Sequence, residues 1–297
     1  MTHRRRGFTL TELLVVVAII GTLLALALPA IQRVRGALAR VECMNKLHQL
    51  GTALHHYHND HNTFPPGLTL PKVGEKYPWM TYLPRVLPYI ERTDLWNQAQ
   101  ECYRLDPNPF HVPPHTPFLT VVKAFTCPLD WRLNEPQPTH QNMIAAHTSY
   151  LGCNGTNRAA RNGVFFGDSR IALTDIHDGT SWTIMVGERP PSTDFWWGWW
   201  YACSGQDGTG APDVLLGVAE TNPGGPVGYV CAPGPYSFSP GKITNNCDAF
   251  KYWSLHQGGT HVMMADKSVH FFSYHGGARV LPALATRSGG EPAMLPD

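Results

Sequence analysis

The stretch that decides the fold is RRRGFTLTELLVVVAIIGTLLALALPAI, residues 4–31. Residues 13–31 form an almost uninterrupted apolar run, in which only Gly21, Thr22 and Pro29 are polar or helix-breaking. At about 1.5 Å per residue, a helix of this length spans roughly the 30 Å hydrocarbon core of a bilayer. Arginines before such a run keep the N-terminus in the cytoplasm. The sequence therefore predicts one membrane-spanning helix with a cytoplasmic N-terminus.

A cleaved secretory signal is the alternative interpretation, because small residues at 25–27 and 28–30 resemble a cleavage site. Two features argue against it. Glu12 lies at the head of the apolar run, where a charge is costly and usually functional. The helical pattern also continues past Pro29.

Beyond Pro29, apolar residues recur at steps of three and four, which predicts one apolar stripe on a helix. The stripe consists of Ile31, Val34, Leu38, Val41, Met44, Leu47, Leu50, Leu54 and Tyr57. It ends before Asn62 and the Phe-Pro-Pro-Gly sequence at 64–67. We therefore predict a helix over residues 8–61, apolar all round in its first half and amphipathic in its second.

Residues 62–297 have the composition of a folded, turn-rich domain. The chain is 43% hydrophobic and 11% aromatic, with 28 Gly and 26 Pro, which favours short strands and loops over a helix bundle. Lys and Arg number 23 against 22 Asp and Glu, and no basic run occurs beyond the N-terminus. Nucleic acid is therefore not expected as a partner. The expected fold class is α+β, with a long N-terminal helix packed on a large β-rich head.

The sequence from Arg6 to Val15, RGFTLTELLV, resembles the type IV prepilin signal. The resemblance implies that a prepilin peptidase cuts between Gly7 and Phe8 and methylates the new N-terminus. It further implies that Glu12 pairs with the N-terminal amine of a neighbouring subunit in an assembly, and that Pro29 kinks the helix.

The rest of the chain resembles pilin-like proteins with domain of unknown function 1559, whose C-terminal mark is an H-x9-DG motif. The matching segments lie at 45–58, 64–67, 175–189, 198–201, 256–266 and 283–290. His256 and Asp266 match the motif, but Lys267 stands where the family has glycine. If the family's Asp-Gly makes a hairpin turn, Lys267 must adopt a positive φ or the turn must change type.

Cysteine usage in an exported head favours disulfides. Cys231 and Cys247 bracket a Gly/Pro-rich loop and are the best candidate pair. Cys102, Cys127, Cys153 and Cys203 allow three further connectivities, and Cys43 lies in the long helix. Because no Cys-x-x-Cys spacing occurs, neither a zinc site nor any other metal or cofactor is expected.

Acid–base or nucleophilic chemistry is not expected either, and the chain is predicted not to be an enzyme. His256 has no recognisable catalytic partner in the sequence, and we expect it to hold a loop over the base of a hairpin formed by residues 261–265 and 268–272. The histidines at 48, 55, 56, 58 and 61 are interpreted as a solvated polar face. Asp175 and Asp178 do not have the spacing of a calcium loop, and Asp178 is expected in a turn that precedes a strand over 182–186.

Four tryptophans suggest an alternative function. If residues 195–201 form a strand, its rings alternate between two faces, and those on the outer face could bind a polysaccharide. The residues concerned are Trp196, Trp197, Trp199 and Trp200.

Together these features predict a leader at 1–7, a pilin-like helix at 8–61 and an extracytoplasmic head at 62–297. The expected function is that of a pilin- or pseudopilin-like structural subunit of the cytoplasmic membrane, able to join a filament or secretion-related complex. The expected partners are a prepilin peptidase, membrane lipid and other pilin-like subunits or further copies of the chain.

Overall fold

The structure is a computed structural model that describes residues 9–139, 143–224 and 231–291. The chain divides into two compact units, residues 1–41 and 42–297. Helix α1 (Leu10–His61) begins in the first unit and ends in the second, which confirms the predicted long helix; Phe8 lies outside the described residues. Pro29 lies inside α1.

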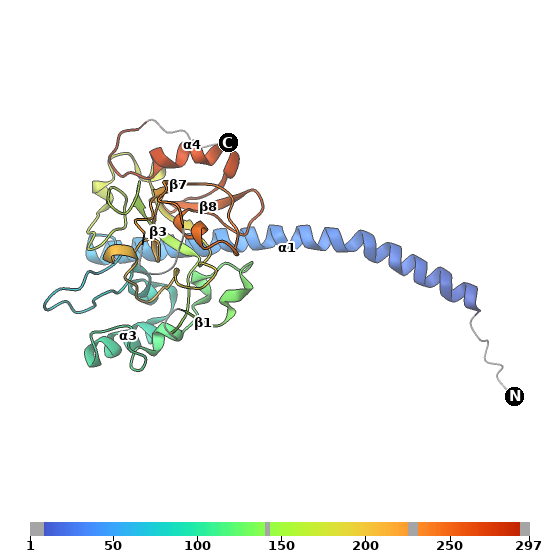
Figure 1. The fold of residues 1–297 in the computed structure, drawn as a ribbon, viewed down its shortest axis with the longest axis horizontal. Coiled ribbons are helices and arrows are strands. Elements are labelled where there is room, and N and C mark those ends of the chain that lie inside the picture. Colours follow the sequence, from blue (N-terminus) through green and yellow to red (C-terminus); the bar gives the residue numbers. More distant parts are fainter. Residues whose placement is uncertain (1–8, 140–142, 225–230, 292–297) are drawn as a thin grey trace. The chain divides into compact units, whose positions relative to one another are not determined.

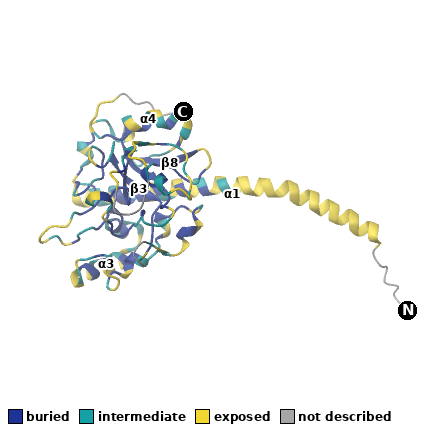
Figure 2. Ribbon diagram, in the orientation of Figure 1, coloured by how far each residue is buried: buried dark blue, intermediate teal, exposed yellow. Residues whose placement is uncertain are grey.

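The first unit contributes one helical segment whose side chains are almost all exposed (Figure 2). An 18-residue window of α1 has a mean hydropathy of 2.8 and none of it is buried. Among the described residues, α1 alone is long and apolar enough to cross a membrane.

The second unit combines short helices and short strands with many loops (Figure 1). Its other α-helices are α2 (Tyr82–Arg85), α3 (Thr93–Leu105) and α4 (Tyr274–Leu284). Its strands are β1 (Gln137–Pro138), β2 (Ile144–Ala145), β3 (Tyr150–Gly155), β4 (Ile184–Glu188), β5 (Leu215–Gly217), β6 (Ala219–Glu220), β7 (Tyr236–Ser237), β8 (Gly259–Met264) and β9 (Val269–Ser273). The predicted β-rich, loop-rich head is confirmed.

A five-stranded sheet with the order β5-β3-β4-β8-β9 forms the centre of this unit. β5 runs parallel to β3, and the other neighbouring pairs are antiparallel. β1 pairs with β2, and β6 with β7, in two separate two-stranded sheets.

Every residue of β3, β4 and β8 is buried, so both faces of the sheet are covered along these three strands. In β8, Met263 joins the cluster that contains Leu50 and Leu54 of α1. Its neighbours Val262 and Met264 join the opposite cluster, which contains residues of α4. The alternation of side chains along a strand therefore places the C-terminal part of α1 on one face and α4 on the other.

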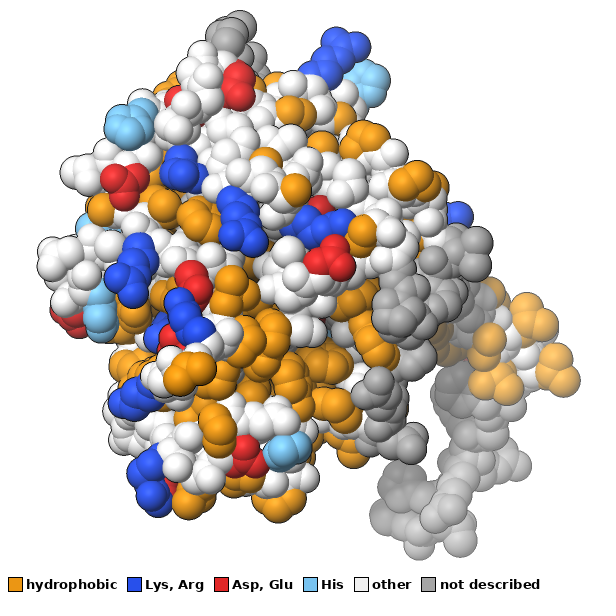
Figure 3. Space-filling view, turned by 60° about the vertical axis from the view of Figure 1, so that its left-hand side comes forward, with side chains coloured by type: hydrophobic (Ala, Val, Ile, Leu, Met, Phe, Trp, Pro, Cys, Tyr) orange, Lys and Arg blue, Asp and Glu red, His pale blue; other side chains and the backbone are white. Residues whose placement is uncertain are grey.

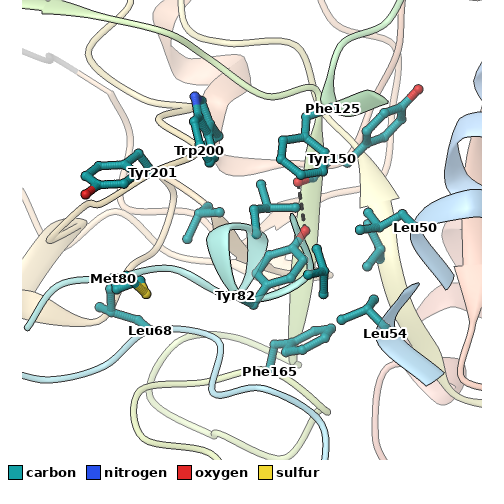
Figure 4. Close-up of a cluster of buried hydrophobic side chains, with 14 of the residues drawn as sticks. Leu50, Leu54, Leu68, Met80, Tyr82, Phe125, Tyr150, Phe165, Trp200 and Tyr201 are labelled. Carbon is teal, nitrogen blue, oxygen red and sulfur yellow. Dashed lines mark hydrogen bonds between the residues drawn. The ribbon is translucent and has the colours of Figure 1, made fainter. Parts of the chain in front are cut away.

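Large aromatic side chains fill the space between α1 and the loops (Figure 4). The Tyr82 hydroxyl donates a hydrogen bond of 2.9 Å to the carbonyl oxygen of Tyr150, so this ring is buried with its polar atom satisfied. The second half of α1, which the sequence predicts to be amphipathic, packs here through Leu47, Leu50 and Leu54 of its apolar stripe.

The predicted hairpin near the C-terminus is confirmed as β8 and β9. Lys267 has a φ of 67°. Its N–H donates to the Met264 carbonyl, and the Met264 N–H donates to the Ser268 carbonyl. These bonds are typical of a three-residue loop whose last position is left-handed, in place of a two-residue type I′ turn. Lys267 therefore occupies a position that favours glycine.

On the face shown in Figure 3, Lys and Arg side chains are interspersed with Asp, Glu and His. This face carries no cluster of a single charge sign, and phosphate binding requires such a cluster.

Candidate functional site: the N-terminal segment and the cluster around His256

Glu12 lies in the first turn of α1. The Thr9 backbone N–H and hydroxyl donate to its Oε2 at 2.9 and 2.7 Å. The carboxylate therefore caps the helix start within this chain. Gly7 and Phe8, the expected processing site, lie outside the described residues.

Glu188 ends β4 and is the centre of a buried polar cluster. Its Oε2 accepts hydrogen bonds from the His261 N–H (2.8 Å), His261 Nδ1 (3.0 Å) and the Thr260 hydroxyl (3.2 Å). Its Oε1 faces His256 Nε2 at 3.4 Å and has no hydrogen-bond partner of good geometry. The carboxylate is thus held rigidly by one oxygen while the other is left available.

His256 lies at the base of the β8–β9 hairpin, as the sequence predicts. The Ser254 hydroxyl accepts from the His256 N–H at 3.1 Å and donates to the Gly259 carbonyl at 2.8 Å. The imidazole packs edge-on against His261, with ring centroids 5.0 Å apart. A buried ring in this place holds the segment that leads into β8.

Two cysteine sulfurs complete the cluster. Cys43 of α1 and Cys127 are both buried, and their Sγ atoms lie 3.1 Å apart. Cys127 Sγ is 3.8 Å from His256 Nε2. The Cys127 N–H donates to the Ser149 hydroxyl at 2.9 Å, which fixes the backbone next to the sulfur.

The four side chains polarise one another. The Cys43 thiol donates to Cys127, which lowers the pKa of Cys127 to about 6 and raises that of Cys43. Burial alone would lower the pKa of His256, but its contacts with Cys127 and Glu188 raise it to about 9. Burial would raise the pKa of Glu188, yet the ion-pair contact with His256 and the hydrogen bonds from His261 hold it well below its usual range. A thiolate, an imidazolium and a carboxylate therefore share one dry space.

Substrate access to this cluster is blocked. A surface cleft of about 510 Å³ has His256 in its wall, between residues 240–244 and 253–258. The side chains of His256 and Glu188 are nevertheless only 0% and 1% exposed. A thiolate beside an imidazolium is the arrangement of a cysteine nucleophile, but a nucleophile must reach its substrate, and this one is enclosed.

Asp266 and Lys267 lie at the far end of the hairpin from His256, where Ala265 and Lys267 contact α1. Asp266 Oδ1 accepts from the Ser268 N–H (2.8 Å) and hydroxyl (2.6 Å), which closes the turn. His48 Nδ1 donates to the Lys267 carbonyl at 3.3 Å, and His55 Nε2 donates to the Ala265 carbonyl at 2.8 Å. The turn is therefore a docking point for the helix.

The interpretation of the α1 histidines as a solvated face is wrong for His55 and His58, which are half-buried, whereas His48 is exposed. His48 and His55 bind the hairpin turn, and His58 Nε2 accepts from the Leu173 N–H at 3.1 Å. These residues follow the same helical spacing as the apolar stripe, so the polar edge of the helix is also part of its contact with the head.

Two further predicted features are structural. The strand expected at 182–186 is β4, Ile184–Glu188, and it follows the Asp178-Gly179 turn, where Gly179 has a φ of 97°. Asp178 accepts hydrogen bonds from the N–H groups of Gly289 (2.7 Å) and Gly290 (2.9 Å). This carboxylate ties the segment after α4 to the start of β4.

Residues 195–201, which were expected to form a tryptophan-bearing strand, do not form one in the structure as described. Gly198 has a φ of 118°, and the N–H groups of Gly198 and Trp199 donate to Asp213 Oδ1 at 2.7 and 2.8 Å. The segment is a loop because these bonds replace a strand ladder. Trp197 and Trp200 are buried, and Trp196 and Trp199 are only partly exposed, so no row of open indole faces is available for a sugar.

The predicted Cys231–Cys247 disulfide is confirmed, with a Cα–Cα distance of 5.5 Å. The expectation of further disulfides among the other head cysteines is wrong, because these residues are free and buried in separate surroundings: Cys102, Cys127, Cys153 and Cys203. Cys102 Sγ, for example, donates to the Pro114 carbonyl at 3.0 Å.

Comparison with protein families agrees with this architecture. A family model described as a protein of unknown function, DUF1559, matches residues 32–276. The chain belongs to the DUF1559 family. A second model, the prokaryotic N-terminal methylation motif, matches residues 2–28 of this DUF1559 protein. No curated protein and no solved structure matches the chain.

The methylation motif indicates a type IV pilin-like substrate of a prepilin peptidase. Together with the single apolar helix, it fits a membrane-anchored DUF1559 protein. This pilin-like family membership suggests a structural rather than an enzymatic protein.

Sequence reasoning missed Glu188, Cys43 and Cys127 as members of one site. Glu188 has a signal in the sequence, because the charged pair Glu188-Arg189 directly follows the apolar run of β4, and a charge at the end of a buried strand requires a partner. The cysteines have none, since Cys43 and Cys127 are 84 residues apart.

Proposed function

We propose that this DUF1559 protein is a pilin-like structural subunit of the cytoplasmic membrane. A prepilin peptidase cuts it between Gly7 and Phe8 and methylates Phe8. The helix from residue 8 onward then anchors it, and the head at 62–297 lies on the outer side. The observation that carries the proposal is the methylation motif at residues 2–28, which includes the start of an apolar helix whose side chains are exposed.

Assembly follows from the same helix. Exposed apolar side chains from Leu10 to Ile31 require lipid or the helices of other subunits. In such a bundle the Glu12 carboxylate would exchange its bonds with Thr9 for the methylated amine of a neighbouring subunit. Pro29 would bend the helix. We therefore propose self-association or assembly with other pilin-like subunits, and no catalytic role.

The processing step is tested on native protein extracted from membranes. Intact-mass and N-terminal analysis should find a chain that begins with N-methyl-Phe8. A Gly7→Val variant should keep its leader and remain in the membrane fraction. A soluble protein beginning at Ile31 would instead identify a cleaved secretory signal.

The assembly step is tested with Glu12→Leu. A charge at the centre of a membrane helix costs about 2.5–3.5 kcal/mol on insertion scales. Glu12 lies in the first turn, where the cost is smaller, so the variant should insert at least as well as the native chain. It should fail to crosslink to neighbouring subunits. Thr22→Leu is the matched control, because Thr22 bonds only the Ala18 carbonyl of its own helix among the described contacts. Equal crosslinking of Glu12→Leu and the control would refute the role of Glu12.

A further inference from the structure

Four buried side chains bring potential metal-binding atoms together. Cys43, Cys127, Glu188 and His256 each contribute one such atom, and all four atoms lie within 4.8 Å of one another. They come from α1, the loop before residue 130, the end of β4 and the segment before β8. All four lie in the second compact unit.

The spacing fits a small tetrahedral site. Metal–ligand bonds of about 2.0–2.3 Å at tetrahedral angles place neighbouring ligand atoms roughly 3.3–3.8 Å apart. The observed separations are 3.1 Å between the two sulfurs, 3.8 Å from Cys127 Sγ to His256 Nε2, and 3.4 Å from that nitrogen to Glu188 Oε1. Small side-chain rotations would suffice to place an ion among them.

The second observation is Glu188 Oε1, which faces His256 Nε2 at 3.4 Å but has no well-formed hydrogen bond from any described residue. Glu188 is 1% exposed, yet its Oε1 accepts no hydrogen bond of good geometry. Its Oε2 meanwhile binds three donors from Thr260 and His261. A carboxylate held by one oxygen with the other facing sulfur and nitrogen atoms is typical of a metal ligand oriented by outer hydrogen bonds. Without an ion, a buried carboxylate oxygen that has only this long contact and no hydrogen bond costs free energy.

The donor set selects the metal. Two thiolates exclude Mg²⁺ and Ca²⁺, which require oxygen ligands. Two sulfurs, one imidazole nitrogen and one carboxylate oxygen suit Zn²⁺ in four-coordinate geometry. With four protein ligands and no exposed position, such a site is closed and structural.

We propose that Cys43, Cys127, Glu188 and His256 form a structural Zn²⁺ site that fastens α1 to the head. On binding, the two sulfurs, His256 Nε2 and Glu188 Oε1 each donate a lone pair to Zn²⁺, and the proton on the Cys43 thiol and the Nε2 proton of His256 leave to solvent. No group is oxidised or reduced. The ion would join segments separated by 84 residues (Cys43 to Cys127) and 129 residues (Cys127 to His256).

A Cys43–Cys127 disulfide is the competing state in an oxidising compartment. The structure bonds Cys231 to Cys247 but leaves Cys43 and Cys127 as free thiols. A disulfide would also leave Glu188 Oε1 and His256 Nε2 facing sulfur atoms that form no bond with them. The geometry favours the metal.

The test measures metal in the full-length chain, purified in detergent under non-reducing conditions without chelators. Elemental analysis and native mass spectrometry should find one Zn²⁺ per chain. Exchange with Co²⁺ should give the thiolate-to-cobalt charge-transfer band and the intense visible bands of tetrahedral Co²⁺. Cys43→Ser and His256→Ala should lose the ion, whereas Cys203→Ser, at another buried free cysteine, should retain it.

Because a ligand variant could fail to fold, the native chain also decides the question by itself. Chelation should lower its melting temperature, and added Zn²⁺ should restore it. A folded native chain that contains no zinc and takes up neither Zn²⁺ nor Co²⁺ would overturn the proposal. Peptide mapping that finds Cys43 bonded to Cys127 would overturn it as well.

Discussion

Replacing Lys267 by glycine should stabilise the head. Lys267 has a φ of 67°, which costs a residue with a Cβ about 1–2 kcal/mol. Glycine removes this cost but loses about 0.4–1 kcal/mol through the greater freedom of the unfolded chain. The contact with α1 persists, because His48 binds the Lys267 carbonyl and not its side chain. The net gain is therefore up to about 1 kcal/mol.

Thermal unfolding of the full-length chain in detergent, followed by tryptophan fluorescence, measures this gain. For a domain of this size, 1 kcal/mol corresponds to a shift of about 2–4 °C in Tm. Lys267→Asn should give a smaller increase, because asparagine tolerates this backbone conformation better than lysine.

Gly258→Ala is the matched control for this experiment. Gly258 has a φ of 87°, and an added Cβ would meet no heavy atom within 4 Å. It should lose about 1 kcal/mol through backbone strain alone. If Gly258→Ala lowers Tm while Lys267→Gly leaves it unchanged or lowers it, the argument from the turn is refuted.

Three further outcomes are expected. Gly51→Ala should lower the free energy of unfolding by about 1–2 kcal/mol, since its Cβ would lie 2.8 Å from the Cβ of Lys267; adding Lys267→Gly should recover part of this loss in a double-mutant cycle. Burial lowers the pKa of His147 to about 4, so the folded state binds fewer protons than the unfolded state between pH 6.5 and about 4. Stability should therefore fall as the pH drops through this window, and His147→Asn should flatten that part of a pH–stability curve; an equally steep curve would exclude this histidine as the cause. Reduction of Cys231–Cys247, which closes a loop of 16 residues, should cost about 3 kcal/mol in denaturant titrations, and a double serine variant that is as stable as the oxidised protein would contradict this value.

Local patterns predicted the elements that depend on local physics. The three- and four-residue spacing from Ile31 to Tyr57 predicted α1, because one stripe of side chains decides helix packing. The apolar runs on either side of Asp266-Lys267 predicted the β8–β9 hairpin. The resemblance to a family with glycine at the second turn position predicted either a positive φ for Lys267 or a change of turn type, and the structure has a positive φ within a three-residue loop.

Features that depend on long-range packing could not be predicted in this way. The aromatic segment around Gly198 has the sequence pattern of a strand. It is a loop because Asp213, 15 residues away in the chain, binds its backbone N–H groups. The cluster around His256 has no spacing rule, since its members come from four separate segments. Four cysteines predicted to form disulfides are instead free and buried, and no spacing in the sequence distinguishes a buried free thiol from a disulfide partner.

The docking of α1 on the hairpin turn has a consequence for synthesis. The hydrogen-bond partners of His48 and His55 lie 219 and 210 residues later in the chain. At about 5–20 residues per second, a ribosome needs roughly 10–40 s to supply those partners. During this time the apolar stripe of the helix lacks the part of its cover that Met263 and Ala265 supply. A chain that stops before β8 would lack these two side chains permanently, and part of the stripe would remain exposed.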